Sequence, residues 1–383
     1  MKWIKLKELN EYKAKSINPL KEPDTIFEMY SVPSYTGRFP EIAIGSEIGS
    51  SKQIVQKGDV LLCKINPRIN RVWEVSQFTD HQSIASSEWI VIRNKDMFSK
   101  YLLWYFRCEY FRTLMTSNIT GMGGSLMRAQ PKQVGKYLVP VPEYDIQVKI
   151  ANVLDKAQFL IDKRKEQIEA CDELIKSVFY EMFGDPIRND KHWEVRKLSH
   201  LGKFIGGGTP SRKIAEYFKG YIPWITTVSL QGKIINEDSA IEFITKDAVL
   251  NSSTKIIPIG SVMIGTRVGV GKTAINICEM CTNQDIMSLT GVSKEIDKQF
   301  LMFVLKGYEE YFNDKKRGAT IQGITGQTLK EINIILPPLN LQNKFATQVQ
   351  KIEQQKHLFK KSLTELETNF NALMQRAFKG ELF

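Results

Sequence analysis

The pattern of apolar and polar positions contains two long stretches with the same helical period. Apolar residues recur every three or four positions from about Asp145 to Phe183, and again from about Asn340 to Phe378. The two stretches align without a gap when residue numbers are shifted by 195. This spacing places the apolar side chains on one helix face, as in the seam of a coiled coil. The sequence therefore predicts two helices, each roughly 55 Å long.

The seam positions match between the two stretches, apart from one polar residue in each, Arg164 in the first and Lys356 in the second. The apolar positions are Ile146, Ile150, Leu154, Ala157, Ile161, Ile168, Cys171, Ile175, Val178 and Met182 in the first stretch, and Leu341, Phe345, Val349, Ile352, Phe359, Leu363, Leu366, Phe370, Leu373 and Ala377 in the second. Each stretch follows a proline entry, begins with a Gln-x-Lys turn at Gln147 or Gln342, and ends at a glycine. A glycine after the last turn is a typical helix stop.

The connection between the stretches predicts their relative direction. A single amphipathic helix of this length cannot bury its seam alone, so we expect the two to pack on each other. The chain leaves the end of the first helix and returns to the start of the second through one segment, and the ends of a compact domain usually lie close together. We therefore predict an antiparallel pair, with both chain termini near the first globular domain.

The segments before the helices also resemble each other. Each has a glycine turn that leads into a short apolar strand, Gly58–Ile65 in one and Gly260–Arg267 in the other, followed by an aromatic helix. Short β-rich runs fill the remainder, which indicates mixed α+β domains. We predict a pseudo-two-fold repeat of two mixed α/β domains separated by two long antiparallel coiled-coil helices. The expected parts are a first domain over 1–142, a central helix over 143–190, a second domain over 191–338 and a C-terminal helix over 339–383.

Composition narrows the class of protein. The chain has 383 residues, a net charge of +11 and five cysteines. The cysteines are scattered and odd in number, which favours reduced thiols. We find no membrane-length apolar run and no signal-peptide core, so we expect a cytoplasmic protein. Both globular segments are basic while the first long helix is acidic, which suits two polyanion-binding domains or simply a basic protein without a nucleic acid partner.

Motifs for catalysis are incomplete. Gly269–Thr273 is similar to the end of a phosphate-binding P-loop, but Thr266 stands where that motif needs its first glycine, and the residues after Lys272 favour a strand over a helix. Cys278 and Cys281 have zinc spacing without a second ligand pair. The four histidines and the carboxylates give no convincing catalytic set. We therefore predict a non-catalytic protein that binds no cofactor or metal of its own.

Candidate DNA contacts lie on polar, basic loops. Arg, Asn, Gln and Lys can contact base edges, while Lys, Arg, Ser and Thr also hold phosphates. A solvated loop is the alternative for any one of these residues. The candidates are Lys64, Asn66, Arg68, Asn70, Arg71, Ser125, Arg128 and Gln130 in the first segment, and Thr209, Ser211, Arg212, Lys213, Arg267, Lys272, Lys315, Lys316, Arg317, Thr320 and Gln322 in the second.

Three features carry a family resemblance. The order of domain, helix, domain, helix, the run Gly207–Ser211 followed by Tyr221–Ile225, and the ending Gln375–Leu382 resemble the specificity subunit of type I restriction–modification systems. The likeness covers nearly the whole chain, although the first domain lacks the Gly-Gly-Thr-Pro-Ser opening.

The resemblance implies a DNA reader. Each target-recognition domain would recognise one half of a bipartite, asymmetric site, and the helices would fix the spacing of the halves. Two methyltransferase subunits would bring S-adenosylmethionine, and restriction subunits would bring ATP and Mg²⁺ for translocation and cleavage. Three alternatives stay open: the specificity subunit of a related system with a fused methyltransferase–nuclease, a coiled-coil scaffold that does not bind DNA, and a P-loop nucleotide hydrolase.

Overall fold

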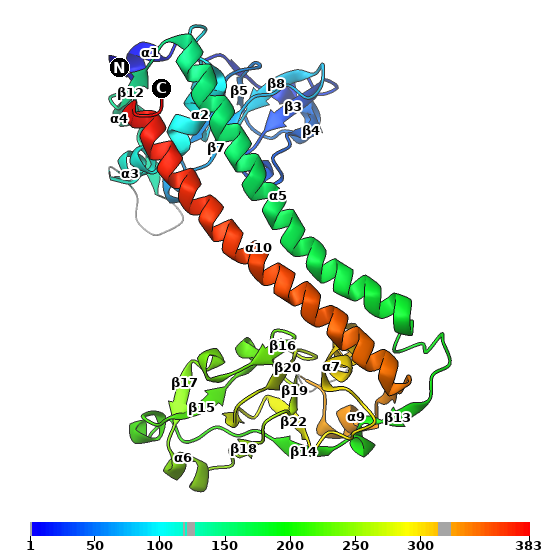
Figure 1. Ribbon diagram of the computed structural model, residues 1–383. Helices are drawn as coiled ribbons and strands as arrows, with labels where there is room; N and C mark the ends of the chain where they lie inside the picture. The colour runs from blue at the N-terminus through cyan, green and yellow to red at the C-terminus, as the bar shows by residue number, and fades with distance from the viewer. Residues whose placement is uncertain (1, 118, 121–126, 313–322) are drawn as a thin grey trace. The chain divides into compact units, whose positions relative to one another are not determined.

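The computed structural model describes residues 2–117, 119–120, 127–312 and 323–383. The chain divides into two compact units (Figure 1). Unit 1 consists of Met1–Glu166 and Lys360–Phe383, and unit 2 consists of Gln167–Phe359. Each unit thus combines one globular segment with parts of both long helices.

Unit 1 is a mixed α+β structure with its strands in several small sheets. The two larger sheets have the strand orders β2-β5-β8-β3-β4 and β7-β6-β9. Its strands are β1 (Lys2–Lys5), β2 (Ser16–Ile17), β3 (Ile26–Tyr30), β4 (Glu41–Ile44), β5 (Lys52–Ile54), β6 (Val60–Cys63), β7 (Val72–Glu74), β8 (Gln82–Ala85), β9 (Trp89–Ile92), β10 (Ile119–Thr120), β11 (Arg128–Ala129) and β12 (Leu138–Val141). Its short helices are α1 (Leu6–Leu9), α2 (Ser99–Arg107), α3 (Glu109–Ser117) and α4 (Pro131–Val134).

Unit 2 repeats the central part of this arrangement with a wider sheet. Its larger sheets have the strand orders β14-β22-β19-β20-β16 and β17-β15-β21-β18. Its strands are β13 (Val195–Lys197), β14 (Lys203–Gly206), β15 (Ile222–Ile225), β16 (Lys233–Ile235), β17 (Glu242–Ile244), β18 (Ile256–Ile257), β19 (Val262–Gly265), β20 (Thr273–Asn276), β21 (Met280–Thr282), β22 (Ile286–Thr290) and β23 (Asn333–Ile335). Its short helices are α6 (Lys246–Leu250), α7 (Lys298–Gly307) and α9 (Gly326–Glu331).

The register of the central strands shows that the two units are structural repeats. Leu62 of β6 lies opposite Val72 on β7 and Ile90 on β9. Ile264 of β19 lies opposite Thr273 on β20 and Met287 on β22 in the same way. The internal repeat and the mixed fold predicted from the sequence are therefore confirmed.

The long helices α5 (Tyr144–Phe183) and α10 (Leu339–Lys379) extend one residue beyond the predicted stretches at nearly every end. In unit 1 the end of α10 packs beside α2, with Phe378 5.6 Å from Tyr101 between ring centroids. In unit 2 the end of α5 packs beside α7 and the start of α10, with Phe183 4.7 Å from Phe300 and 5.5 Å from Phe345. In unit 1 the first turns of α5 share a core with the last turns of α10, and in unit 2 the last turns of α5 share a core with the first turns of α10, so the antiparallel prediction is confirmed.

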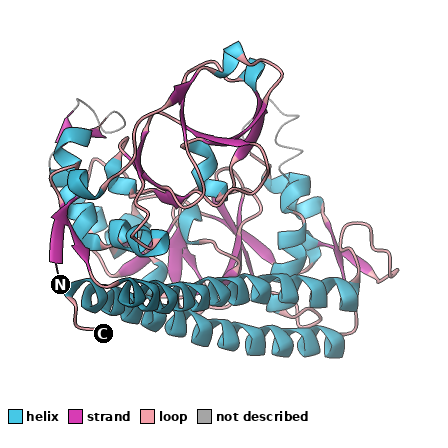
Figure 2. Ribbon diagram, turned by 90° about the horizontal axis from the view of Figure 1, so that it is seen from above, coloured by secondary structure: helices cyan, strands magenta, loops and turns pink. Residues whose placement is uncertain are grey.

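The termini also lie where the connections predicted. β1 pairs with β12, and the last turns of α10 lie in the unit 1 core. Figures 1 and 2 show the marked N and C ends beside each other in unit 1. Ion pairs between the helices add to the apolar seam: Lys165 lies 2.9 Å from Glu367 in unit 1, and Lys356 pairs with Asp172 in unit 2. The polar seam position Lys356 is thus neutralised by a partner on the facing helix.

A buried glutamine fixes the start of each long helix. The Gln147 side chain is 1% exposed, accepts a hydrogen bond from the Phe98 N–H (2.9 Å) and donates to the Pro142 carbonyl (2.9 Å). Gln342 is fully buried, accepts from the Asp297 N–H (2.8 Å) and donates to the Pro337 carbonyl (2.7 Å). Because Phe98 and Asp297 cap α2 and α7, each amide joins a long helix to the aromatic helix of the same unit. This explains the repeated Gln-x-Lys turn.

The glycine stops take the backbone conformation that the sequence predicted. Gly184 has φ 73° and Gly380 has φ 79°, both in the left-handed region that other residues avoid. In the part of the chain that the structure describes, no helix has the length and apolar character needed to cross a membrane.

Candidate nucleic-acid interface

Two equivalent hairpins present five of the predicted basic residues. In unit 2, β19 and β20 form an antiparallel hairpin whose tip spans residues 266–272. Lys272 therefore leads into a strand, whereas the lysine of a P-loop leads into a helix. The structure contradicts the P-loop alternative and shows the glycine-rich hairpin with exposed Arg267 and Lys272 at its tip.

The equivalent tip in unit 1 joins β6 to β7 over residues 64–71. A 3₁₀ turn at Pro67–Ile69 lies between Asn66 and Asn70, which have φ 47° and φ 49°. Asparagine tolerates this left-handed conformation better than most residues. The Asn70 side chain donates to the Arg107 carbonyl (3.1 Å), so its amide holds the tip in place, and Arg68 and Ile69 are the exposed residues of the turn.

A three-segment junction positions the unit 1 tip. The Lys64 N–H donates to the Glu88 carbonyl (3.0 Å), and the Lys64 carbonyl accepts from the Ala129 N–H (2.8 Å). The Asn66 N–H donates to the Met127 carbonyl (2.8 Å). Arg128 on β11 forms an ion pair of 3.0 Å with Glu88. The junction therefore gathers the predicted residues Lys64, Asn66 and Arg128, and it places the exposed Gln130 and the half-buried Arg71 at its margins.

The same junction occurs in unit 2. The Thr266 N–H donates to the Asp285 carbonyl (2.8 Å), and the Thr266 carbonyl accepts from the Ile324 N–H (2.8 Å). Thr266 corresponds to Lys64, so Arg267 occupies the place of Ile65. The arginine of the junction thus comes from the hairpin tip in unit 2 and from the facing strand in unit 1.

The Gly-Gly-Thr-Pro-Ser opening lies against this junction in unit 2. A Cβ on Gly207 would lie 2.0 Å from the Asn283 carbonyl oxygen, so only glycine permits the close approach. Thr209, which follows, donates to the Gln284 side chain beside Asp285. Trp224 is 3% exposed and donates to the Gly208 carbonyl (3.1 Å), so it belongs to the core. Ser211 and Lys213 are exposed on the same loop.

Arg212 is engaged within unit 2. Its guanidinium forms a bidentate ion pair with Glu242, and it lies 4.3 Å from the centroid of the Phe218 ring. The hydrogen bonds from Arg212 lower the pKa of the Glu242 carboxyl. In this structure Arg212 holds the loop to β17, and a phosphate would have to compete with Glu242 for it.

The remaining candidates Ser125, Lys315, Lys316, Arg317, Thr320 and Gln322 lie outside the described residues. Sequence reasoning missed the two carboxylates of the junctions, Glu88 and Asp285. An alignment of the two segments around Glu88–Trp89 and Asp285–Ile286 would have revealed an acid before the same strand in both.

The described ranges contain no group of three or more His, Cys, Asp or Glu side chains able to hold a metal ion. Cys281 is buried, and desolvation raises the pKa of its thiol to about 11.

Known proteins share both sequence and fold with this chain. Residues 190–368 match the model of the type I restriction modification DNA specificity domain. The chain is 37% identical over 161 residues to the type I restriction enzyme MjaIX specificity subunit of Methanocaldococcus jannaschii, covering 41% of this chain and 37% of that protein. It is 28% identical over 230 residues to the EcoR124I/EcoR124II specificity subunit of Escherichia coli, covering 56% and 55%. The chain thus spans about a third to half of these relatives.

A solved structure shows the same fold over the whole chain. It comes from work on complex assembly and conformational transition of the type I R-M system, and it covers 100% of this chain and 98% of its own, with a TM-score of 0.69 and 20% identity. At this identity the likeness supports the arrangement of elements rather than any residue's role.

Proposed function

We propose, from the premise that this chain belongs to the specificity-subunit family of type I restriction–modification systems, that it is the DNA reader of such a complex. Each unit recognises one half of a bipartite, asymmetric target. Recognition then directs adenine methylation or cleavage by the partner subunits.

The observation that carries this proposal is the repeated junction. Both units hold a basic hairpin tip with the same backbone hydrogen bonds, at Lys64 in one and Thr266 in the other. The residues around the tips differ between the units, with Asn66, Arg68 and Arg128 in unit 1 and Arg267 and Lys272 in unit 2. A common scaffold with different side chains suits two half-sites of different sequence.

The proposal assigns the chemistry to partners. Two methyltransferase subunits supply S-adenosylmethionine, and restriction subunits supply ATP-driven translocation with Mg²⁺. The chain itself binds neither cofactor and catalyses no step, and the assembly works on DNA in the cytoplasm. Its net charge of +11 favours association with a polyanion.

The test is co-expression of the chain with its modification subunits in a host without other adenine methylation. Sequencing of methylated bases should reveal one bipartite motif with two unlike halves. A contiguous motif would contradict the assignment of one unit to one half. No methylation, together with no retardation of duplex DNA by the assembled complex, would favour the scaffold alternative.

A further inference from the structure

An acidic residue lies beside each basic tip, in the turn that faces it. Glu88 and Asp285 occupy equivalent positions, because their carbonyls accept the N–H groups of Lys64 (3.0 Å) and Thr266 (2.8 Å). Both lie in the turn that leads into the equivalent strands β9 and β22. The carboxylate therefore recurs in the same place although most of the surrounding side chains differ.

Such a placement has an electrostatic cost for a protein that binds DNA. A carboxylate repels the phosphate backbone, and the repulsion grows where water is excluded. A residue that served only to strengthen binding to any duplex would not be acidic. A carboxylate does, however, accept hydrogen bonds from the exocyclic amino groups that bases present in the major groove.

The hydrogen bonding of the Glu88 carboxylate leaves one oxygen available to accept from a base amino group. Its Oε1 accepts from Arg128 (3.0 Å), whereas its buried Oε2 has no hydrogen-bond partner within the described part of the chain. An unpartnered buried carboxylate oxygen is unfavourable unless a ligand completes it. Glu88 also lines a pocket of about 370 Å³ together with Ile65 and Ser86.

Arg128 provides the means to expose this acceptor. Its side chain is 47% exposed, and an ion pair at that exposure is weak because solvent screens it. A DNA phosphate competes well for an exposed arginine, because a guanidinium binds phosphate bidentately. Transfer of Arg128 from Glu88 to the backbone would free the carboxylate for a base.

We propose that Glu88 and Asp285 are specificity-determining residues, each of which accepts a hydrogen bond from the amino group of a cytosine or adenine in its half-site. The inference rests on the proposed function. It names two side chains that would discriminate between bases within the half-sites. In unit 1, Arg128 covers Glu88 until DNA binds. In unit 2, the Asp285 carboxylate is held by the Asn283 side chain (3.1 Å).

The experiment compares Glu88→Gln and Asp285→Asn in the complex with the modification subunits. Each change keeps the shape and one oxygen but removes the charge and adds an amide donor. Methylated-base sequencing should show that Glu88→Gln relaxes one base pair of one half-site, with discrimination there falling on the order of tenfold. Asp285→Asn should relax one base pair of the other half-site.

Asp24→Asn is the matched control, because Asp24 is an exposed acid of unit 1 outside the junction. It should leave the methylated motif unchanged. Arg128→Gln should weaken binding to all duplexes alike and leave the base preference intact, as expected of a phosphate contact.

The outcomes separate the inference from the proposed function. A wild-type complex that methylates no bipartite site would overturn the proposed function itself. A wild-type complex that does so, with a Glu88→Gln variant that binds every duplex more tightly and shifts no base pair, would overturn the inference alone. If Glu88→Gln fails to assemble, Glu88→Asp keeps the charge and shortens the reach; an unchanged motif would then count against base contact.

Discussion

The central sheets of the two units share three strands and differ at their edges. Unit 2 flanks β22, β19 and β20 with β14 on one side and β16 on the other. Unit 1 has only β9, β6 and β7 in the equivalent places. A free strand edge leaves unpaired backbone groups and invites association with another chain. The two units solve this problem in different ways.

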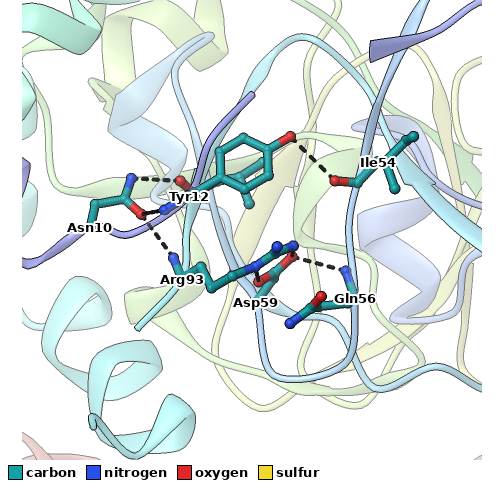
Figure 3. A network of polar contacts seen from close by, with 7 residues as sticks. Asn10, Tyr12, Ile54, Gln56, Asp59 and Arg93 are labelled. Carbon is teal, nitrogen blue, oxygen red and sulfur yellow. Dashed lines mark hydrogen bonds and ion pairs between the residues drawn. The ribbon is translucent and has the colours of Figure 1, made fainter. Parts of the chain in front are cut away.

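Side chains replace the missing strands in unit 1. In the place where β14 pairs with β22 in unit 2, the Asn10 side chain of unit 1 donates to the Val91 carbonyl (2.9 Å). It also accepts from the Arg93 N–H (2.9 Å), as Figure 3 shows. Asn10 also accepts from the Tyr12 N–H (3.0 Å), and Arg93 forms a bidentate pair with the buried Asp59. One amide and its neighbours thus close an edge that needs a whole strand in unit 2.

The opposite edge of the central sheet, formed by β20 in unit 2 and β7 in unit 1, also has different partners in the two units. In unit 2 the Thr273 carbonyl accepts from the Gly232 N–H (2.8 Å) in the turn before β16. In unit 1 the equivalent Val72 carbonyl accepts from the Arg107 side chain (2.9 Å). The three central strands are therefore common to both units. The sheet edges differ between the units, and in each the backbone groups at the edge have a hydrogen-bond partner.

The largest expected effect comes from Gly207, which directly follows β14, a strand that only unit 2 has. Gly207→Ala should destabilise the chain by about 3 kcal/mol or more, because its Cβ would lie 2.0 Å from the Asn283 backbone oxygen. Gly206→Ala is the matched control, since its Cβ meets only the Met287 sulfur at 3.6 Å. Denaturant unfolding gives the free energies, and hydrogen exchange should locate the loss in β14 and β22. Equal stability of both variants would mean that the Gly207–Ser211 segment can move away from Asn283.

The next effect concerns the edge that unit 1 closes with an amide. Asn10→Ala removes three hydrogen bonds and should cost roughly 2–3 kcal/mol. Asn10→Asp keeps the acceptor for Tyr12 and Arg93 and should lose less. Hydrogen exchange of the Arg93 amide is the measurement, and unchanged protection in Asn10→Ala would show that the edge is closed by other groups.

A smaller effect, on binding rather than stability, tests the arginine of the unit 2 junction. Arg267→Ala should weaken recognition of one half-site by roughly 1–3 kcal/mol and spare the other, because unit 1 has Ile65 at this place. Competition binding with duplexes altered in each half-site measures the difference. An equal loss on every sequence would identify Arg267 as a phosphate contact.

The smallest effect is a pH dependence confined to unit 2. Arg212 lowers the pKa of Glu242, so the pair stabilises the folded state above the unfolded carboxyl pKa, and this contribution disappears as the pH falls through the lowered folded value. The gain should be less than about 1 kcal/mol, since Arg212 is 57% exposed. Glu242→Gln should remove the contribution of this pair from acid unfolding curves between neutral and low pH. A wild-type curve identical to that of the variant would show that solvent screens the pair fully.

Several features followed from the sequence because they depend on local periodicity. The three- and four-residue spacing of the seam determined the two long helices, and every apolar seam position is buried or half-buried. The glycines at 184 and 380 determined where the helices stop, since only glycine takes that backbone conformation without strain. The shift of 195 between Gln147 and Gln342 revealed the repeat, and the single segment that connects the two helices predicted the antiparallel pairing.

Other features depended on contacts between residues far apart in the chain. The role of Gln147 required its pairing with Phe98, and the closure of the β9 edge required Asn10 to reach Val91. The engagement of Arg212 by Glu242 and the place of Glu88 beside Arg128 follow from strand pairing that no local pattern encodes. Hydrogen bonds of this kind join single polar side chains to backbone groups, and a single polar residue carries no period. The sequence therefore determined the elements and their repetition, whereas the tertiary structure decided which polar side chains close edges, which pair with one another and which face outward.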